Sequence, residues 1–372
     1  MLVSVPKEVK NKEYRVGITP AGVKALADKG HQVLVEKDAG TAIGISDADY
    51  VAAGAKIVAT AKEAWSGDMV VKVKEPLAQE YQYFREGMVL FTYLHLAAEP
   101  ELTKALLDKK VTAIAYETVQ LPNRQLPLLA PMSEVAGRMA AQVGANLLTK
   151  NEGGMGLLMG GTAGVPAANF VVVGAGVVGF NAAKVAVGMG AKVTILDVNI
   201  NRLREIDDLY GNKIQTIYSN SLNVAEAVKH ADVVVGSVLI PGAATPQLVT
   251  EEMVNSMKPG SVIVDVAIDQ GGAVETTAKH GATSHDNPTF IHNGVVCYCV
   301  GNMPGAVART STFTLTNATL PYMVKLANLG WKEACKKDEA LAKGLNTHEG
   351  KLYFQGVAEK LNLPCSALSE IL

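Results

Sequence analysis

A glycine-rich turn between a strand and a helix constrains this chain most. The sequence GAGVVG, from Gly174 to Gly179, follows the apolar run Asn169–Val173 and leads into a helical stretch, Phe180–Met189. In a G-x-G-x-x-G turn, Gly174 permits the tight bend, Gly176 lets the backbone approach a pyrophosphate, and Gly179 lets the helix pack on the strand. The helix N-terminus itself favours an anion. The pattern therefore predicts a dinucleotide-binding βαβ unit.

An acidic residue ends the next predicted strand, Lys192–Leu196. Asp197 lies 18 residues beyond Gly179, where such folds place the acid that hydrogen-bonds a ribose 2′-hydroxyl. Because a carboxylate there repels a 2′-phosphate, the sequence predicts NAD rather than NADP, although Arg202 five residues later weakens this preference. The alternative is a glycine-rich turn followed by an aspartate that only caps a helix.

Strands and helices alternate along both halves of the chain, which predicts an α/β fold with parallel sheets. The strands expected in the first half are Leu2–Val5, Gln32–Val35, Met69–Val73, Met88–Thr92 and Thr112–Ala115. The helices expected between them are Thr19–Lys29, Asp47–Ala53, Lys62–Ser66 and Glu99–Lys109. The strands expected after Lys192–Leu196 are Lys213–Tyr218, Asp232–Val235, Ser261–Val266 and Val295–Val300, with helices at Leu222–His230 and Glu251–Met257.

The length of 372 residues suits two domains. A long helix is expected at Ser133–Thr149, and a helical pattern runs from Thr310 to about Leu345, before a tail too small to fold alone. We therefore expect two Rossmann-like domains whose parallel sheets face a cleft and are joined by long helices. Residues 1–130 with 310–372 are expected to form a discontinuous substrate domain, and residues 131–309 the NAD-binding domain.

Composition excludes several classes of function. The 34 Lys and Arg balance 36 Asp and Glu, and aromatic residues are only 5%, so no nucleic-acid partner is expected. The segment Gly153–Ala183 has no charge, but its nine glycines and Pro166 favour a buried strand, turn and helix over a membrane span. The N-terminus becomes charged by residue 7, which is not typical of a signal peptide. A cytoplasmic location is therefore expected.

Cysteine and histidine spacing gives no sign of a disulfide framework or a metal site. Four cysteines without a C-x-x-C pair indicate reduced thiols. They are Cys297, Cys299, Cys335 and Cys365. Six histidines show no paired spacing for a metal and are interpreted as structural or surface residues; they are His31, His230, His280, His285, His292 and His348.

Charged residues follow several predicted strands, at the sheet edge where open α/β folds bind ligands. Lys74 follows Met69–Val73, His95 follows Met88–Thr92, and Arg15 lies in the connection after the first strand. In the second half, Asp269 follows the strand Ser261–Val266. Each of the four also has an ordinary structural explanation, as a solvated cation, a core histidine or a capping aspartate.

Together, these four side chains indicate one class of substrate and one type of reaction. Arginine binds a carboxylate bidentately, lysine polarises a carbonyl oxygen, and histidine moves protons near neutral pH. An aspartate orients water or holds a cationic intermediate. The set suits a small α-amino or α-hydroxy acid that delivers a hydride to a nicotinamide.

Several long motifs together resemble a known family. They are EYRVGITPAGV (13–23), VKVKEP (71–76), TYLHLA (92–97), AYETVQ (115–120), APMSEVAGR (130–138), VVVGAGVVGFNAAKVAVGMGA (171–191), VDVAIDQGG (264–272) and GNMPGAVARTST (301–312). Over nearly its whole length the sequence resembles alanine dehydrogenases, within the alanine dehydrogenase and nicotinamide nucleotide transhydrogenase superfamily. The loop MGGTAGVPAANF (159–170) departs from the family's usual turn, and the segment between Asp269 and Asn302 is slightly longer.

The resemblance implies a role for each matching residue. Arg15 and Lys74 would hold the substrate carboxylate and carbonyl, and His95 and Asp269 would be the catalytic acid and base. The residues implied to wall a pocket sized for a methyl group are Tyr93, Met132 and Met303. The residues implied to line the NAD site are Ser133, Gly174, Gly176, Val178, Gly179, Asp197, Arg202, Ser219, Val238, Leu239, Ile268 and Asn302. A homohexamer is implied as well.

The expected function is NAD-dependent, reversible oxidative deamination of L-alanine to pyruvate and ammonium. Three alternatives remain open on sequence alone. One is the soluble nucleotide-binding subunit of a transhydrogenase, which needs a membrane partner, and another is an opine or saccharopine type dehydrogenase. The third is a non-catalytic sensor that binds NADH and shows no reduction of NAD dependent on an amino acid.

Overall fold

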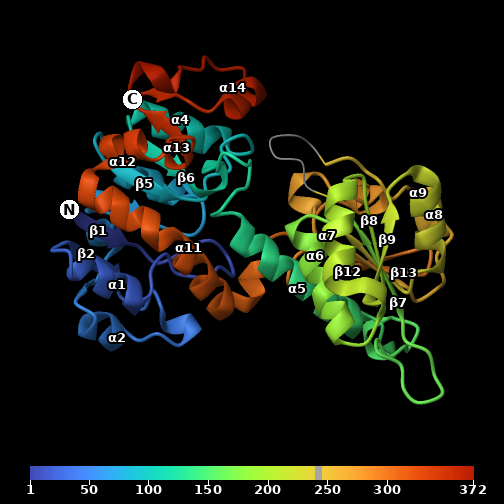
Figure 1. Cartoon of the computed structure of the whole chain (residues 1–372). Helices are drawn as coiled ribbons and strands as arrows, with labels where there is room; N and C mark the ends of the chain where they lie inside the picture. The colour runs from blue at the N-terminus through green and yellow to red at the C-terminus, as the bar shows by residue number, and fades with distance from the viewer. Residues whose placement is uncertain (239–244) are drawn as a thin grey trace. The chain divides into compact units, whose positions relative to one another are not determined.

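The computed structural model describes residues 1–238 and 245–372, which form two compact units. Unit 1 consists of Met1–Met132 and Val307–Leu372, and unit 2 consists of Ser133–Ala306. Both chain ends lie in unit 1, where the red C-terminal segment joins the blue and cyan N-terminal elements (Figure 1). Each unit is built on one largely parallel sheet, so the predicted α/β fold class is confirmed.

The sheet of unit 1 has the strand order β15-β14-β6-β5-β4-β1-β2-β3. Its strands are β1 (Leu2–Val5), β2 (Gln32–Glu36), β3 (Lys56–Val58), β4 (Met69–Val71), β5 (Val89–Thr92), β6 (Thr112–Ala115), β14 (Leu345–His348) and β15 (Lys351–Leu352). The strands from β6 to β3 pair in parallel, whereas β14 and β15 add an antiparallel edge. The carboxyl ends of β4, β5 and β6 therefore lie side by side.

Some helices of unit 1 begin where their sequences supply starting signals. They are α1 (Pro20–Ala27), α2 (Asp47–Ala52), α3 (Ala61–Ala64), α4 (Pro100–Asp108), α11 (Ala308–Leu329), α12 (Trp331–Lys337), α13 (Glu339–Ala342) and α14 (Gln355–Leu361), with 3-10 turns η1 (Thr41–Ile43), η2 (Ala78–Tyr83), η3 (Tyr116–Thr118) and η8 (Leu368–Glu370). Pro20 occupies the first position of α1, and Ser46 and Asp49 form a capping box at α2.

The C-terminal part of unit 1 differs from the sequence prediction. The helical pattern expected up to Leu345 is interrupted at Gly330, whose φ is +75°, and again at Asp338, which caps α13. The strands β14 and β15 were not predicted, nor was β3 in the N-terminal part of the unit. The strand β14 has the sequence LNTH, which lacks the apolar run that marks a buried strand, and it is recognised only through its pairing with β6.

The sheet of unit 2 has the strand order β12-β13-β11-β10-β7-β8-β9. Its strands are β7 (Asn169–Val173), β8 (Lys192–Asp197), β9 (Ile214–Tyr218), β10 (Val233–Gly236), β11 (Val262–Asp265), β12 (Thr289–His292) and β13 (Val295–Tyr298). All pairs are parallel except the hairpin β12–β13, which turns through Asn293 and Gly294, both at positive φ. The strand order reverses between β7 and β10, which is where such sheets bind nucleotides.

Unit 2 packs apolar helix faces on both sides of its sheet. Its helices are α5 (Ala130–Leu147), which begins in unit 1, α6 (Val177–Gly188), α7 (Ile200–Tyr210), α8 (Ser221–His230), α9 (Glu251–Asn255) and α10 (Glu275–His280), with 3-10 turns η4 (Lys150–Glu152), η5 (Gly211–Lys213), η6 (Ile268–Gln270) and η7 (Met303–Val307). The sequence did not predict α7, which Asn199 caps, or α10.

The uncharged segment Gly153–Ala183 contains β7 and the start of α6, as predicted. Among the described residues, no helix is both long enough and apolar enough to cross a membrane. All four cysteines are free thiols, and only Cys365 is exposed.

A buried ion-pair cluster lies beside β4 in unit 1. Lys72 directly follows β4, and its fully buried Nζ lies 2.9 Å from Glu8 Oε2 and 3.1 Å from Glu80 Oε1. Burial raises the pKa of Glu8, although Lys72 opposes this effect. Burial also opposes the charge of Lys72, but the two carboxylates raise its pKa overall. The charge of Lys72 and the charges of the two carboxylates therefore stabilise one another in this buried cluster.

Replacing Lys72 by methionine is expected to lower the free energy of unfolding by about 3–5 kcal/mol, because two carboxylates then stay buried without their cation. A carboxyl group whose pKa is raised on folding favours the folded state at low pH and disfavours it as pH rises. The loss is therefore expected to be smaller at about pH 5 than at about pH 8. Denaturant unfolding at both pH values measures it.

The matched control is Lys104→Met, because Lys104 forms an ion pair with Asp108 on the exposed face of α4. Losing this surface pair should cost at most about 0.5 kcal/mol. Equal losses in the two variants would contradict the structural importance of the buried cluster.

Candidate active site

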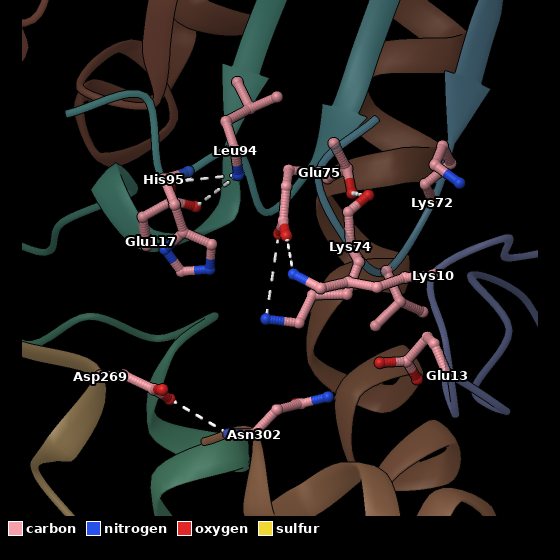
Figure 2. Close-up of polar contacts among 12 residues, drawn as sticks. Lys10, Glu13, Lys72, Lys74, Glu75, Leu94, His95, Glu117, Asp269 and Asn302 are labelled. Atoms are coloured by element: carbon pink, nitrogen blue, oxygen red, sulfur yellow. Dashed lines mark hydrogen bonds and ion pairs between the residues drawn. The ribbon is translucent and has the colours of Figure 1, made fainter. Parts of the chain in front are cut away.

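Three residues of unit 1 meet beyond the carboxyl ends of β4 and β5. Lys74 lies three residues beyond β4, and its Nζ is 3.9 Å from Glu75 Oε2. Glu75 also forms an ion pair with Lys10, so one carboxylate joins two lysines (Figure 2). Burial opposes the charge of Glu75, yet its pKa is lowered overall by Lys74, Lys10 and His95. This edge of the sheet therefore concentrates positive charge around a buried anion.

Arg15 is the most deeply buried cation of the predicted site, at 3% exposure. Its Nε and Nη2 donate to the two carboxylate oxygens of Glu13 at 2.7 and 2.6 Å. Although burial opposes its charge, this bidentate pair raises the pKa of Arg15, so the guanidinium stays charged. Its Nη1 lies 3.2 Å from the sulfur of Met132, which places two predicted substrate residues in contact.

His95 is exposed, and its ring stacks on Tyr93 with centroids 5.9 Å apart and planes 11° apart. Tyr93 is buried, and its hydroxyl donates to the carbonyl oxygen of Leu128. Burial raises the pKa of Tyr93, so the phenol stays neutral. Tyr93 also packs edge-on against Tyr116, with centroids 5.1 Å apart. The imidazole therefore rests on a fixed aromatic base with its polar edge accessible.

In unit 2 the glycine turn follows β7 at the strand-order reversal. Gly174 has a φ of +102°, which favours glycine, and a Cβ on Gly179 would lie 1.8 Å from the oxygen of Gly174. Apart from its chain neighbours, no described atom lies within 4 Å of the Cβ position of Gly176, which is the N-cap of α6. The turn thus offers open space beside a helix N-terminus, which fits a pyrophosphate.

Asp197 ends β8 beside this turn. Its Oδ2 accepts a hydrogen bond from Ala175 N at 2.6 Å, and its Oδ1 accepts one from Asn199 N at 2.7 Å. Arg202 donates from Nε to the oxygen of Ala175 at 2.9 Å and pairs through Nη1 with Glu205 at 2.7 Å. Its guanidinium also lies 4.5 Å from the ring centroid of Phe180. The acid therefore braces the glycine turn, while the arginine is engaged with protein groups.

Asp269 lies on η6, just beyond β11, and is exposed. Its Oδ2 accepts a hydrogen bond from the main-chain nitrogen of Asn302 at 3.2 Å (Figure 2). Asn302 has a φ of +60°, and a Cβ on its neighbour Gly301 would lie 2.7 Å from Asp269 Oδ1. The candidate base and the candidate cofactor residue are thus joined directly.

The remaining predicted residues fall as follows. Ser133 and Val238 are half-buried, and a Cβ on Gly174 would lie 2.9 Å from Val238 Cγ2. Val178 and Ile268 are buried, at 8% exposure each. Ser219 donates its main-chain N–H to Asp197 O at 2.9 Å. Met303 belongs to the buried core of unit 2, and Leu239 lies outside the described residues.

The predicted residues divide between the two units. Arg15, Lys74, Tyr93, His95 and Met132 belong to unit 1, and the others belong to unit 2. Sequence reasoning missed the carboxylates Glu13, Glu75 and Glu117, each of which contacts a predicted residue. Glu117 lies two residues beyond Ala115, the last residue of β6. A charged residue just beyond a strand is the signal that identified Lys74 and His95, and the same signal is present at Glu117. Among the described residues, no group of three or more His, Cys, Asp or Glu side chains is arranged to hold a metal ion.

Comparisons with known proteins agree on one family. Residues 4–136 match the model of the alanine dehydrogenase/PNT N-terminal domain, and residues 140–355 match that of the C-terminal domain. An alanine dehydrogenase from Bilophila wadsworthia is 69% identical over 376 residues, covering 100% of both chains. The solved structure of an L-alanine dehydrogenase matches with a TM-score of 0.94 and 52% identity, covering 97% of this chain and 99% of the other. A transhydrogenase from Sinorhizobium meliloti matches with a TM-score of 0.82 and 29% identity, covering 95% and 100%.

Proposed function

Because the chain belongs to the alanine dehydrogenase/PNT family, we propose that it catalyses the reversible oxidative deamination of L-alanine by NAD. Alanine, water and NAD give pyruvate, ammonium, NADH and a proton. The observation that carries this proposal is the similarity to alanine dehydrogenases over the full length of the chain. The protein is an oxidoreductase that uses a nicotinamide cofactor.

Unit 1 supplies the groups that hold the amino acid. Arg15 binds the substrate carboxylate, because its guanidinium stays charged although it is buried and its planar fork matches a carboxylate. Lys74 polarises the oxygen that becomes the carbonyl of pyruvate. Tyr93 and Met132 wall the space for the methyl group, together with Met303, the third residue implied by the resemblance, which belongs to unit 2. Glycine is discriminated only weakly, because one methyl group contributes about 1–3 kcal/mol.

The candidate acid and base move the protons of the reaction. A bound nicotinamide would supply the acceptor for the hydride of Cα, and loss of that hydride would leave an iminium on the substrate. His95 or Asp269 removes a proton from water as the water oxygen bonds to that carbon, which gives a carbinolamine. A proton is then transferred to the nitrogen, and the hydroxyl proton is removed as the C–N bond breaks and the C=O bond of pyruvate forms, which releases ammonium. Fixed charges at Arg15 and Lys74 stabilise the developing charge without reorganising.

The cofactor preference follows from the two charged groups beside the glycine turn. Asp197 repels a 2′-phosphate and accepts hydrogen bonds from a free ribose hydroxyl. Arg202 is the cation that weakened the preference for NAD in the sequence. It donates hydrogen bonds to Ala175 O and to Glu205, and its guanidinium lies over the ring of Phe180. NAD is therefore the proposed cofactor, with Ser133, Gly176, Ser219, Val238, Leu239, Ile268 and Asn302 completing its site.

Changing Asp197 to alanine is expected to lower kcat/KM for NAD by about 10–100-fold, the value of a hydrogen bond to a charged group. The value for NADP should fall less, because the repulsion of its phosphate is removed at the same time. Steady-state kinetics with both dinucleotides measures the ratio. Asp208→Ala, an exposed change on α7, is the control and should leave the ratio unaltered. If the ratio of kcat/KM for NAD to kcat/KM for NADP is unchanged in Asp197→Ala, Asp197 is not the residue that selects NAD.

The experiment that tests the function follows NADH absorbance after mixing the purified protein with NAD and a panel of L-amino acids. Reduction with L-alanine, reversed by pyruvate and ammonium, supports the proposal, with serine, glycine, lysine and NADP as controls. Binding of NADH without reduction by any amino acid would favour a transhydrogenase subunit or a sensor instead. The homohexamer implied by the resemblance and the cytoplasmic location expected from the N-terminal sequence belong to this proposal, and sedimentation of the purified protein tests the first.

A further inference from the structure

The main chain at His95 is held in an unusual conformation. Its φ is +50°, in the left-handed region that residues with a Cβ adopt rarely. His95 follows β5 by three residues, and its carbonyl oxygen accepts a hydrogen bond from Ala98 N at 2.8 Å. A conformation of this kind persists when surrounding groups fix it, and such residues gather at functional sites.

The carboxylate of Glu117 is the group that fixes it. Glu117 Oε1 accepts hydrogen bonds from His95 N at 2.7 Å and from Leu94 N at 3.1 Å, and Oε2 lies 3.3 Å from Leu94 N (Figure 2). Two successive N–H groups that converge in this way, with a left-handed residue, form a concavity that binds anions. Here a side chain of the same unit fills that concavity.

The sheet places Glu117 opposite this turn. β5 and β6 pair in parallel, with Thr92 aligned with Ala115, so the residues that follow the two strands emerge next to each other. Glu117 lies on η3, whose last residue is anchored because Asn346 Nδ2 donates to Thr118 Oγ1 at 2.7 Å. Tyr116, on the other side of Glu117, packs edge-on against Tyr93, the ring on which His95 stacks. Both neighbours of Glu117 are thus fixed.

We propose that Glu117 is a positioning residue for the deamination. Its carboxylate holds the main chain of Leu94 and His95 so that the imidazole is presented at one place, and it makes no contact with the substrate itself. This inference rests on the proposed function, in which His95 handles protons. It differs from a role in stability because the hydrogen bonds of Glu117 end on the turn that carries His95.

The test uses the full-length protein with Glu117→Ala and Glu117→Gln. Glu117→Ala is expected to lower kcat for alanine oxidation by roughly 10–100-fold, because misplacing a reacting group has effects of this size. NADH affinity should stay within about twofold, since the dinucleotide residues belong to unit 2. Glu117→Gln keeps one acceptor oxygen and should fall between Glu117→Ala and the unmodified protein. The control Glu101→Gln, exposed on α4, should keep full activity.

Recovery of kcat on adding formate distinguishes a positioning role of Glu117 from a purely structural one. In Glu117→Ala the two N–H groups lose their anion, and added formate should restore part of kcat by occupying the same concavity. It should restore nothing in the unmodified protein or in Glu117→Gln. The inference is wrong if Glu117→Ala keeps its kcat. It is also wrong if the fall in kcat comes with weaker NADH binding and a lower thermal unfolding midpoint, and formate restores nothing. Failure of the unmodified protein to oxidise alanine would instead refute the proposed function.

Discussion

Alanine in place of His95 is expected to lower kcat for alanine oxidation by roughly 10²–10⁴-fold, the usual contribution of a positioned acid or base. The imidazole is exposed and rests on the ring of Tyr93, so its removal leaves no cavity in the core and should not disturb the fold. NADH affinity should stay within about twofold, because the dinucleotide residues are in the other unit. Steady-state NADH absorbance and NADH fluorescence titration measure the two quantities.

The control for this prediction is His230→Ala. His230 is exposed at the end of α8 and pairs with Glu226, so its loss should leave kcat unchanged. A His95→Ala protein that turns over at the normal rate, or one that fails to bind NADH, would refute the division of labour between the units.

Arg15→Ala should also abolish turnover, but it is the less informative variant. The guanidinium forms a buried, bidentate pair with Glu13, whose side chain is fully buried. Removing it leaves a carboxylate without its cation, which costs about 3–5 kcal/mol of stability in addition to any effect on substrate. Loss of activity in this variant therefore has two causes, whereas loss in His95→Ala has one.

Replacing Gly179 by alanine is expected to weaken NADH binding by at least about tenfold and to lower the free energy of unfolding by about 1–3 kcal/mol. The new methyl group would lie 1.8 Å from the oxygen of Gly174 and 2.6 Å from the hydroxyl of Ser237. The first contact is with backbone, so α6 must move away from β7, and the glycine turn must move with it. Fluorescence titration of NADH and denaturant unfolding measure the two losses.

Gly188→Ala is the matched control, because it makes the same change on the same helix. No described atom lies within 4 Å of a Cβ at Gly188. Alanine is the better helix former, by up to about 1 kcal/mol, so this variant should be as stable as the unmodified protein or slightly more stable. If both variants bind NADH normally, the close packing of α6 on β7 is not required for the cofactor site.

The parts of this site that could be predicted are those that local sequence encodes. The glycine turn sits between β7 and α6 because its motif follows an apolar run, and Lys74 and His95 could be identified because each follows a short apolar run. In each case the signal spans only a few residues. The same reasoning identified Asp197 and Asp269 as acids at strand ends.

The partners of these residues depend on distant segments and were not predicted. Glu117 contacts His95 only because β5 and β6 are neighbours in the sheet, and Lys10 reaches Glu75 across 65 positions. The strand β14 is polar and short, and only its pairing with β6 makes it a strand. The pair Glu13–Arg15 lies two residues apart, but whether they turn towards each other depends on burial, which periodicity does not give.

The pairing of β6 with β14 has a consequence for biosynthesis. Ala115 leaves the ribosome 230 positions before Leu345, which at ordinary elongation rates is a delay of roughly 10–50 s. During that interval the contiguous segment Ser133–Ala306 has all the strands of its own sheet, whereas the edge of β6 has no partner. A nascent chain with an open edge is prone to pair with its neighbours on a polysome. Chaperone demand should therefore be greatest for the half of the protein that is translated first, because that half is the last to be completed.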